Sequence, residues 1–171
     1  MKKGDIIQLE IEKYGFEGKG IAKVRKSIIN DSGNDNDDEK NYVVFVSGAF
    51  PGDKVNARLL KIKKSYADAK AVEILTPSKF RIKPECKYFG VCGGCRQQDL
   101  IYKKQLKFKQ QQVKEIFEHI GGLTNFEFPE IIPSEKIFYY RNKMEFSFAD
   151  RRWLTKNEIG NPDITDLNFA L

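Results

Sequence analysis

The chain has 171 residues, of which 40% are hydrophobic and 32% are charged, and its net charge is +6. This length suits one medium domain or two small ones with a strongly hydrated surface. No apolar run approaches the roughly 18 residues that a membrane span needs, and no apolar signal region follows the first residues. The sequence therefore argues against membrane and secreted proteins, and we expect a cytoplasmic location.

Charge is unevenly distributed along the chain. The segment 31–39 carries five acidic residues and no basic one. The segment from Lys54 to Lys114, by contrast, contains 16 Lys or Arg residues and only four Asp or Glu residues, which gives it a net charge of +12. A polyanion is a natural partner for such a segment, because neutralised phosphates release counterions. A basic, solvated surface without a partner explains the charge equally well.

Residues 1–76 show the pattern of short strands joined by turns. Residues 5–11 alternate, with Ile7, Leu9 and Ile11 on one face, and predict a strand. A glycine-rich stretch follows at residues 14–24, and the acidic, Gly/Asn-rich residues 27–41 predict a flexible hairpin loop.

Three more strands are expected in this part of the chain, at residues 42–46, 54–62 and 66–75. Between the first two, Pro51 and Gly52 suit the central positions of a type II turn. Together with the glycine-rich stretch 14–24, whose glycines are flanked by strand formers, this makes five short strands without a helix. Such a set favours a small closed β-barrel, because closure removes exposed sheet edges. We place the domain boundary at Thr76-Pro77.

The second unit, residues 77–171, is expected to be α+β. A helix is predicted from Leu100 to about Ile120, with Asp99 as its cap and Gly121-Gly122 as its stop. Further strands are predicted at residues 138–148 and 166–171. The apolar residues 168–171 end without a turn or polar tail, so we expect the chain to be a fragment of a longer protein.

The sharpest motif is a cluster of three cysteines, Cys86, Cys92 and Cys95, with the spacing C-x5-C-x2-C. Thiolates are ligands for iron–sulfur clusters and for zinc, and Gly93-Gly94 allows a tight turn between the last two. The alternative to a metal site is that the three cysteines are free thiols in a loop. An odd number of cysteines in a reducing compartment favours metal binding over a disulfide framework.

Either metal usually takes four ligands, and the chain has three cysteines and one histidine, His119. A zinc site using His119 is one possibility, although this histidine also suits the C-terminal end of the predicted helix without a metal. The other is an iron–sulfur cluster whose fourth cysteine lies outside this chain.

Candidate RNA contacts are spread over three regions. Lys61, Lys63, Lys64 and Tyr66 combine charge with an aromatic ring on a predicted hairpin, a pattern that suits phosphates and a stacked base but also a solvated hairpin. Lys19 lies in the glycine-rich stretch, and the same two interpretations apply to it: an RNA contact or a solvated side chain.

Arg141 and Lys143 share one face of the strand predicted at residues 138–148. That face suits phosphates or base edges, or is the charged outer side of an ordinary strand. No phosphate-binding glycine loop and no nucleophile with a neighbouring base is present in the sequence, so we expect no catalysis by this chain alone.

Together these motifs resemble a known family. The cysteine motif followed by Gln97-Gln98 and the helix start at residues 102–107 resembles the iron–sulfur motif of RNA uracil-C5 methyltransferases, and residues 140–148 resemble a segment of the same family's central domain. The stretches 18–22, 44–46 and 48–55 resemble a TRAM domain, a small RNA-binding barrel of OB-like type.

The resemblance implies an enzyme that uses S-adenosylmethionine to methylate C5 of a uridine in 23S ribosomal RNA, with transfer RNA as the less favoured alternative. In that family four cysteines hold a 4Fe-4S cluster, and the first three match Cys86, Cys92 and Cys95. The family's catalytic cysteine, general base and cofactor site belong to a C-terminal Rossmann-like domain that has no counterpart in this chain. The expected partner is RNA rather than DNA or a membrane, and the chain is expected to be a monomer.

Two other functions remain open at the level of sequence. One is a stand-alone RNA-binding module with a zinc site that uses His119. The other is an electron-transfer protein, against which the basic surface and the missing fourth ligand count.

Overall fold

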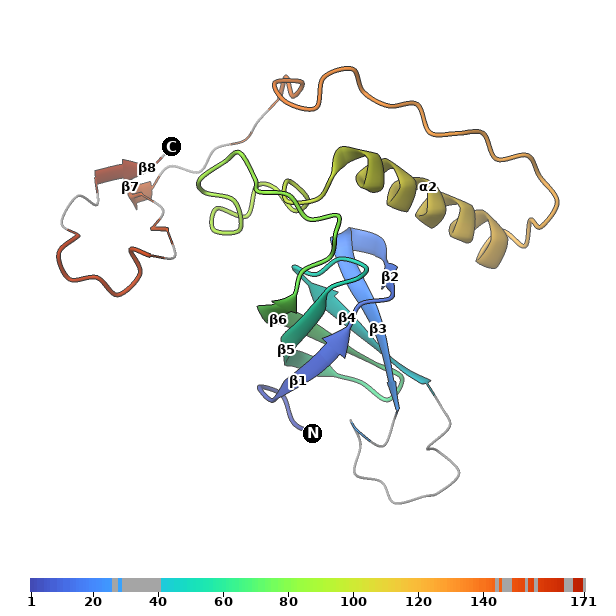
Figure 1. Ribbon diagram of the computed structural model, residues 1–171, viewed down its shortest axis with the longest axis horizontal. Helices are drawn as coiled ribbons and strands as arrows, with labels where there is room; N and C mark the ends of the chain where they lie inside the picture. The colour runs from blue at the N-terminus through green and yellow to red at the C-terminus, as the bar shows by residue number, and fades with distance from the viewer. Residues whose placement is uncertain are drawn as a thin grey trace.

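Figure 1 shows the computed structural model of the chain. The structure describes residues 1–25, 28, 41–143, 145, 149–152, 154–155, 157–164 and 168–170. A small β-barrel forms the N-terminal part, a helix and an irregular loop lie above it, and an extended segment leads to a small strand pair near the C-terminus.

The described part of the first 76 residues contains six strands and one 3-10 turn. They are β1 (Ile6–Glu10), β2 (Lys13–Tyr14), η1 (Phe16–Gly18), β3 (Lys19–Arg25), β4 (Asn41–Ser47), β5 (Lys54–Ile62) and β6 (Tyr66–Thr76). The sheet order is β1-β5-β6-β4-β3-β2. The β4–β6 pair is parallel, and the other pairs are antiparallel.

The sheet closes on itself because β1 and β2 are two halves of one bent strand. Only Ile11 and Glu12 separate them. The N–H of Ile11 donates to the carbonyl of Asp53 beside β5 (2.9 Å), whereas the N–H of Glu12 donates to the carbonyl of Ile21 on β3 (2.9 Å). One strand therefore pairs with both ends of the sheet, which confirms the mainly β class and the predicted barrel.

The barrel interior is filled by the alternate side chains that the sequence pattern predicts. Ile7, Leu9 and Ile11 are buried with exposed residues between them, and Val44, Val46 and Val55 have no exposed surface. Small side chains such as Ala57, Ala67 and Ala69 complete this core. At roughly 25 cal/mol per Å² of apolar surface, burial of this interior is the main term that stabilises the barrel.

The predicted turn at residues 49–53 is present. The N–H of Asp53 donates to the carbonyl of Phe50 (2.9 Å), and Gly52 has a φ of +90°, as the third position of a type II turn requires. A side chain at Gly52 would also approach Oγ of Ser78 to 3.1 Å. The turn leaves Asp53 fully buried at the end of the barrel that faces the second unit.

The single long helix in the described residues, α2 (Tyr102–His119), matches the predicted helix within two residues. The prediction that Asp99 caps it was wrong. Ile101 occupies the N-cap position without a side-chain hydrogen bond, and the Asp99 carboxylate pairs instead with Arg81. The helix ends as expected: Gly122 has a φ of +66°, and the N–H of Leu123 donates to the carbonyl of Phe117 (3.0 Å).

The chain beyond α2 returns along the helix without regular secondary structure (Figure 1). Rings of Phe126 and Phe128 lie 5.5 and 6.1 Å from the ring of Phe117, and Nε2 of Gln110 donates to the carbonyl of Pro129 (2.9 Å). A pair of short antiparallel strands, β7 (Ala149–Arg151) and β8 (Asn168–Ala170), follows.

The strand predicted at residues 138–148 was wrong for 138–143, where the structure shows bends and coil. A strand needs a partner for its backbone groups, and within the described residues this segment has none. Met144 and residues 146–148 lie outside the described residues, as does nearly all of the loop predicted at 27–41. The last predicted strand is present as β8.

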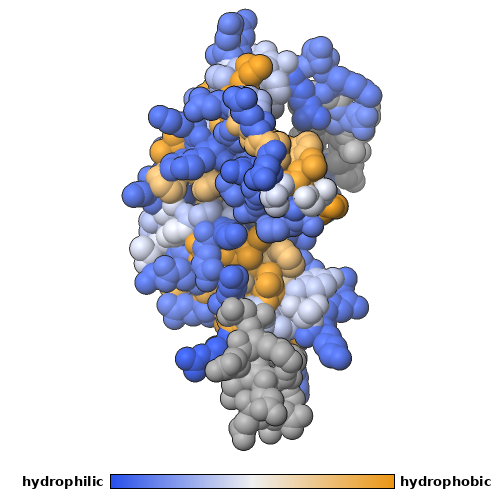
Figure 2. Space-filling model, turned by 90° about the vertical axis from the view of Figure 1, so that its right-hand side faces the viewer, coloured by the Kyte–Doolittle hydropathy of each residue, from blue (hydrophilic) through white to orange (hydrophobic). Residues whose placement is uncertain are grey.

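No helix among the described residues is both long enough and apolar enough to cross a membrane. Figure 2 shows hydrophilic side chains over most of one face, with apolar ones between them.

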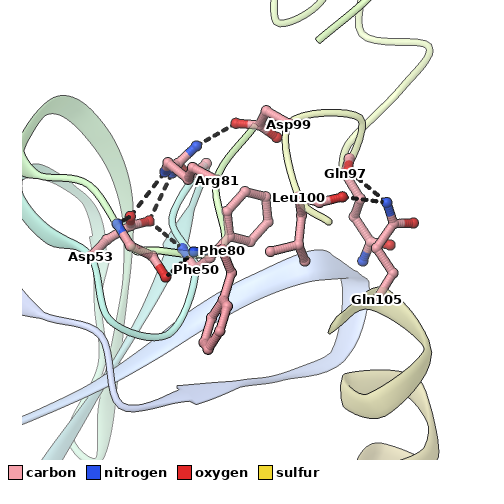
Figure 3. A network of polar contacts seen from close by, with 10 residues as sticks. Phe50, Asp53, Phe80, Arg81, Gln97, Asp99, Leu100 and Gln105 are labelled. Atoms are coloured by element: carbon pink, nitrogen blue, oxygen red, sulfur yellow. Dashed lines mark hydrogen bonds and ion pairs between the residues drawn. The ribbon is translucent and has the colours of Figure 1, made fainter. Parts of the chain in front are cut away.

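A salt bridge joins the barrel to the second unit. The guanidinium of Arg81 donates to both carboxylate oxygens of Asp53, from Nε to Oδ1 (2.9 Å) and from Nη2 to Oδ2 (2.7 Å). Its Nη1 donates to Asp99, and its Nη2 also reaches the carbonyl of Gly48 (3.0 Å) (Figure 3). The guanidinium carbon lies 4.6 Å from the centroid of the Phe50 ring. We call Asp53, Arg81 and Asp99 the carboxylate clamp.

Apolar contacts accompany the clamp. Tyr14 and Phe50 from the barrel form a second buried cluster with Leu100, and Phe80 and Phe108 pack against it. The Tyr14 ring lies 5.6 Å from that of Phe50 and 5.3 Å from that of Phe108. Phe80, Leu100 and Phe108 are thus packed on the barrel end, although β6 stops at the expected boundary, Thr76.

Replacing Arg81 tests the clamp. In Arg81→Met the fully buried Asp53 carboxylate keeps its backbone donors but loses its cation, and we expect a loss of about 3–5 kcal/mol in unfolding free energy. The measurement is urea denaturation followed by circular dichroism. The control is Arg58→Met on exposed β5 surface, with an expected change within about 0.5 kcal/mol. A loss below about 1 kcal/mol in Arg81→Met would contradict the role of the clamp.

Asp99 gives the clamp a pH dependence. Burial raises the pKa of Asp99, Arg81 opposes that rise, and the Asp53 carboxylate adds to it. The folded chain therefore holds this proton more tightly than the unfolded chain does. The resulting stabilisation is complete below the unfolded pKa, near 4, and is lost as the pH rises through the folded pKa.

We expect the stability of the wild type relative to Asp99→Asn to increase when the pH is lowered from about 7 to about 4. Urea denaturation of both proteins at the two pH values measures the change. A relative stability that decreases on acidification would show that Arg81, rather than burial, dominates the ionisation of Asp99.

Candidate metal and RNA-binding site

The three cysteines lie on one loop that immediately precedes α2. Cys86 and Cys95 are exposed and Cys92 is partly buried, and all three are free thiols. The loop is built from tight turns: the N–H groups of Val91 and Cys92 donate to the carbonyl of Tyr88 at 3.0 and 3.2 Å. Gly90 and Gly93 have φ values of +78° and +76°, which glycine adopts readily.

Gln98 connects the two ends of this loop. Its Oε1 accepts a hydrogen bond from the backbone N–H of Cys86 (2.8 Å), and its Nε2 lies 4.0 Å from Sγ of Cys95. One amide side chain thus spans the first and last cysteines and keeps them on the same part of the loop.

The loop as it stands does not fit a metal centre. Within the part of the chain that the structure describes, no three His, Cys, Asp or Glu side chains gather closely enough to hold a metal ion. Space is available for rearrangement, because a Cβ at Gly90 or Gly93 would meet no atom within 4 Å. The chemistry of three thiols suits an iron–sulfur cluster or zinc, but their present arrangement suits neither.

His119 does not join the cysteines. It is the last residue of α2, whereas the cysteine loop precedes the first residue, Tyr102. At 1.5 Å per residue the helix separates these two positions by about 26 Å. A zinc site that combines His119 with the cysteines therefore has no support in this structure.

The residues directly after Cys95 connect the cysteine loop to the barrel. Nη1 of Arg96 donates to the carbonyl of Glu17 in η1 (2.9 Å), and Nε2 of Gln97 donates to the hydroxyl of Tyr14 (2.8 Å). Glu17 has a φ of +57°, a left-handed conformation that costs a non-glycine residue about 1 kcal/mol or more. Arg96 thus holds the one strained residue of this turn.

α2 completes the junction from the other side. Nε2 of Gln112 donates to the carbonyl of Gly15 (2.6 Å), and Lys13 pairs with Glu115 (3.5 Å). Burial raises the pKa of Tyr14, and the hydrogen bond from Gln97 opposes that rise. The turn at residues 14–18 is therefore held by both the cysteine loop and α2.

The predicted RNA contacts do not come together. Lys19 lies near the junction, but its ammonium pairs with Asp68 (3.2 Å) and Glu17 (3.3 Å), and the hydrogen bond with Asp68 is the main cause that raises the pKa of Lys19. A phosphate would have to compete with these two carboxylates.

Lys61, Lys63 and Lys64 are exposed on the β5–β6 hairpin, at the other end of the barrel. The nine residues of β5 separate this hairpin from Asp53 by about 30 Å. Tyr66 is half-buried against the ring of Phe45 (5.8 Å between centroids), so only part of its ring is open to a base.

Arg141 and Lys143 are exposed on the irregular segment after α2 rather than on a strand. Nε of Arg141 donates to the carbonyl of Lys143 (3.0 Å), and Lys143 pairs with Glu145 (3.7 Å). Both are accessible to a polyanion, but no strand face aligns them.

Sequence reasoning missed the residues that join the two units: Asp53, Arg81, Arg96 and Gln97. A signal existed for Asp53, since an acidic residue directly after a Pro-Gly turn is well placed to accept backbone N–H groups, as Asp53 does from Phe50 (2.6 Å) and Ser78 (2.7 Å). No pattern in the sequence identified its partner Arg81, 28 residues later.

Comparison with known proteins agrees with this architecture. Residues 1–72 match the model of the TRAM domain. Among similar curated proteins, one from Chlorobaculum tepidum is 34% identical over 99% of this chain and 33% of its own length, and one from Bacteroides thetaiotaomicron is 41% identical over 84% of this chain and 28% of its own. A protein from Thermotoga maritima is 40% identical over 85% of this chain and 29% of its own length.

All three are named uncharacterized RNA methyltransferases. The chain spans about a third of the length of these curated relatives. Among solved structures, a conserved protein of Methanococcus maripaludis is 26% identical over 42% of this chain and 81% of its own, with a TM-score of 0.31.

The matches cover the barrel, the cysteine loop and α2 together. Residues 1–72 thus match the TRAM domain model, and most of the chain is similar to the N-terminal part of longer proteins named RNA methyltransferases.

Proposed function

We propose that this chain is the RNA-binding and cluster-binding part of an S-adenosylmethionine-dependent RNA uracil-C5 methyltransferase that acts on 23S ribosomal RNA. The observation that carries the proposal is a TRAM barrel fixed to a three-cysteine loop, in a chain similar to the N-terminal third of proteins named RNA methyltransferases. S-adenosylmethionine binding and methyl transfer fall to the remaining two thirds of such proteins, and this chain alone has no methyltransferase activity.

The role of the chain in this function is to bind RNA. The segment from Lys54 to Lys114 brings its net charge of +12 to β5, β6, the cysteine loop and the first part of α2. Lys61, Lys63 and Lys64 are exposed at one end of this basic region, and Arg141 and Lys143 are exposed on the segment after α2. These residues, with Tyr66 and Lys19, are the proposed contacts to phosphates and bases.

The cysteines are proposed to hold a 4Fe-4S cluster. Cys86, Cys92 and Cys95 would supply three thiolates if the loop brought them together, and a fourth ligand would come from outside this chain. Iron–thiolate bonds to these residues would fix the loop. Since Arg96 and Gln97 follow Cys95 directly and bond to the barrel turn, an ordered loop also orders the surface around residues 14–18.

RNA binding is tested with a fluorescein-labelled 20-nucleotide RNA hairpin and fluorescence anisotropy. We expect the affinity to fall steeply with salt, with a slope of log K against log [salt] of about −0.7 to −0.9 for each neutralised phosphate. A DNA hairpin of the same sequence should bind more weakly. Undetectable binding, or binding insensitive to salt, would refute the proposal for this chain.

Metal binding is tested on anaerobically purified protein by analysis of iron, sulfide and zinc together with the visible absorption spectrum. We expect iron and sulfide in the wild type and their loss in the triple variant Cys86→Ser, Cys92→Ser, Cys95→Ser. Val91→Ala, which changes the same loop without removing a thiol, is the matched control. Stoichiometric zinc without sulfide would contradict the cluster proposal and indicate a zinc site instead.

A further inference from the structure

A second basic surface, apart from the candidate contacts described above, surrounds the ring of Phe80 and the first two turns of α2. We call it the Phe80 patch. It consists of Lys79, Phe80, Lys103, Lys104 and Lys107. None of its four lysines was singled out as an RNA contact by the sequence motifs, and the patch joins residues more than twenty positions apart.

The patch is organised by the aromatic ring. Nζ of Lys104 lies 4.0 Å and Nζ of Lys79 lies 5.4 Å from the centroid of Phe80. Cation–π attraction holds each ammonium near the ring at about 0.5–1 kcal/mol for exposed sites. The ring thus gathers two ammonium groups within reach of one anionic chain.

The backbone beneath the patch is rigid. The carbonyl of Phe80 accepts the N–H of Ile101 (3.0 Å), and the carbonyl of Asp99 accepts the N–H of Ile82 (3.0 Å). The Phe80 ring itself packs on the buried cluster of Tyr14, Phe50 and Leu100. The lysines are thus carried by a fixed base, which lowers the ordering cost of binding.

The charge of the patch is uncompensated within the described part of the chain. None of its four lysines lies within 4 Å of a carboxylate among those residues, whereas Lys13, Lys19, Lys54 and Lys114 are all paired. The first turn of α2 contains no acidic residue and has Lys103 and Lys104 in its place. Cations at this end oppose the helix dipole at a cost of about 0.3–1 kcal/mol each, so they weaken the helix that carries them.

The spacing of the lysines suits a phosphate chain. Lys103 and Lys107 are exposed and lie one helical turn apart, about 6 Å along the axis. On one strand the phosphates rise by roughly 3.4 Å per nucleotide along the axis, so phosphates two nucleotides apart are separated by about 7 Å in that direction. Lys104, three positions before Lys107, neighbours it on the helix surface and connects this pair to Phe80 and Lys79.

We propose that the Phe80 patch binds the phosphate backbone of RNA. The proposal rests on the proposed RNA-binding function and adds to it a surface on the second unit, beside the cysteine loop. RNA contacts would then extend from the TRAM barrel across the carboxylate clamp onto α2.

The test compares two quadruple variants that lose the same charge. One is Lys79→Gln, Lys103→Gln, Lys104→Gln, Lys107→Gln in the patch, and the other is Lys2→Gln, Lys3→Gln, Lys23→Gln, Lys70→Gln on exposed positions of the barrel. Both are titrated with the labelled RNA hairpin between 50 and about 200 mM salt, the range over which phosphate contacts are revealed. Circular dichroism verifies that each variant is folded.

The patch variant should bind at least about tenfold more weakly than the wild type, with a salt slope smaller by about 2–3, as expected for three or four lost phosphate contacts. The barrel variant should keep most of the slope of log K against log [salt] that the wild type shows. Equal losses of affinity and slope in both variants would mean that only the overall charge matters. That result would overturn the patch proposal but not the proposal that the chain binds RNA.

Two further outcomes are distinct. If the wild type binds no RNA, the proposed function fails, and the patch proposal fails with it. If poly-L-glutamate of matched charge displaces the RNA as effectively as unlabelled hairpin does, the patch recognises polyanions such as acidic proteins, and its assignment to RNA is overturned.

Discussion

The buried ion pair between Asp53 and Arg81 is the interaction on which the arrangement of this chain depends. Asp53 ends the turn that closes the barrel, and Arg81 begins the segment that leads to the cysteines. A fully buried carboxylate is costly unless it is paired and hydrogen-bonded, and Asp53 receives two backbone N–H groups as well as the guanidinium. The same residue therefore stabilises the turn and fixes the second unit to it.

Asp99 extends this interaction to the start of α2. Its Oδ2 accepts from Arg81, while its Oδ1 is buried without a hydrogen-bond partner among the described residues. The buried cluster of Tyr14, Phe50 and Leu100 lies directly beside these charges. One compact junction thus joins the barrel, the cysteine loop and the helix. A substitution of Asp53, Arg81 or Asp99 is therefore expected to affect all three parts of the chain.

The junction gives the cysteine loop a structural link to the barrel surface. Arg96 and Gln97 bond to the turn at residues 14–18, and Gln98 bonds to Cys86. Two consecutive side chains therefore connect the loop to the barrel, and the third joins the two ends of the loop. A metal centre held by these cysteines would fix the loop and, through Arg96 and Gln97, the barrel turn at residues 14–18.

Much of the barrel was predictable from sequence because each pattern that identifies a strand or turn lies within a few consecutive residues. The alternation of Ile7, Leu9 and Ile11 and the Pro51-Gly52 turn each identify their element without knowledge of the rest. Closure of the sheet through one bent strand and the pairing of Asp53 with Arg81 were not predictable, since both depend on contacts between distant residues. The failed strand at 138–143 shows the same limit: its alternation was present, but the described residues contain no partner strand for it.

The parallel β4–β6 pair and the clamp also determine when this domain can fold during synthesis. β4 cannot complete its pairing until β6 has been made, and Asp53 has no cation until Arg81, 28 residues later, has left the ribosome. At about 5–20 residues per second this interval lasts a few seconds. The nascent barrel passes that time with an open edge and an unpaired carboxylate, so the TRAM domain gains its full stability only together with the segment that leads to the cysteines.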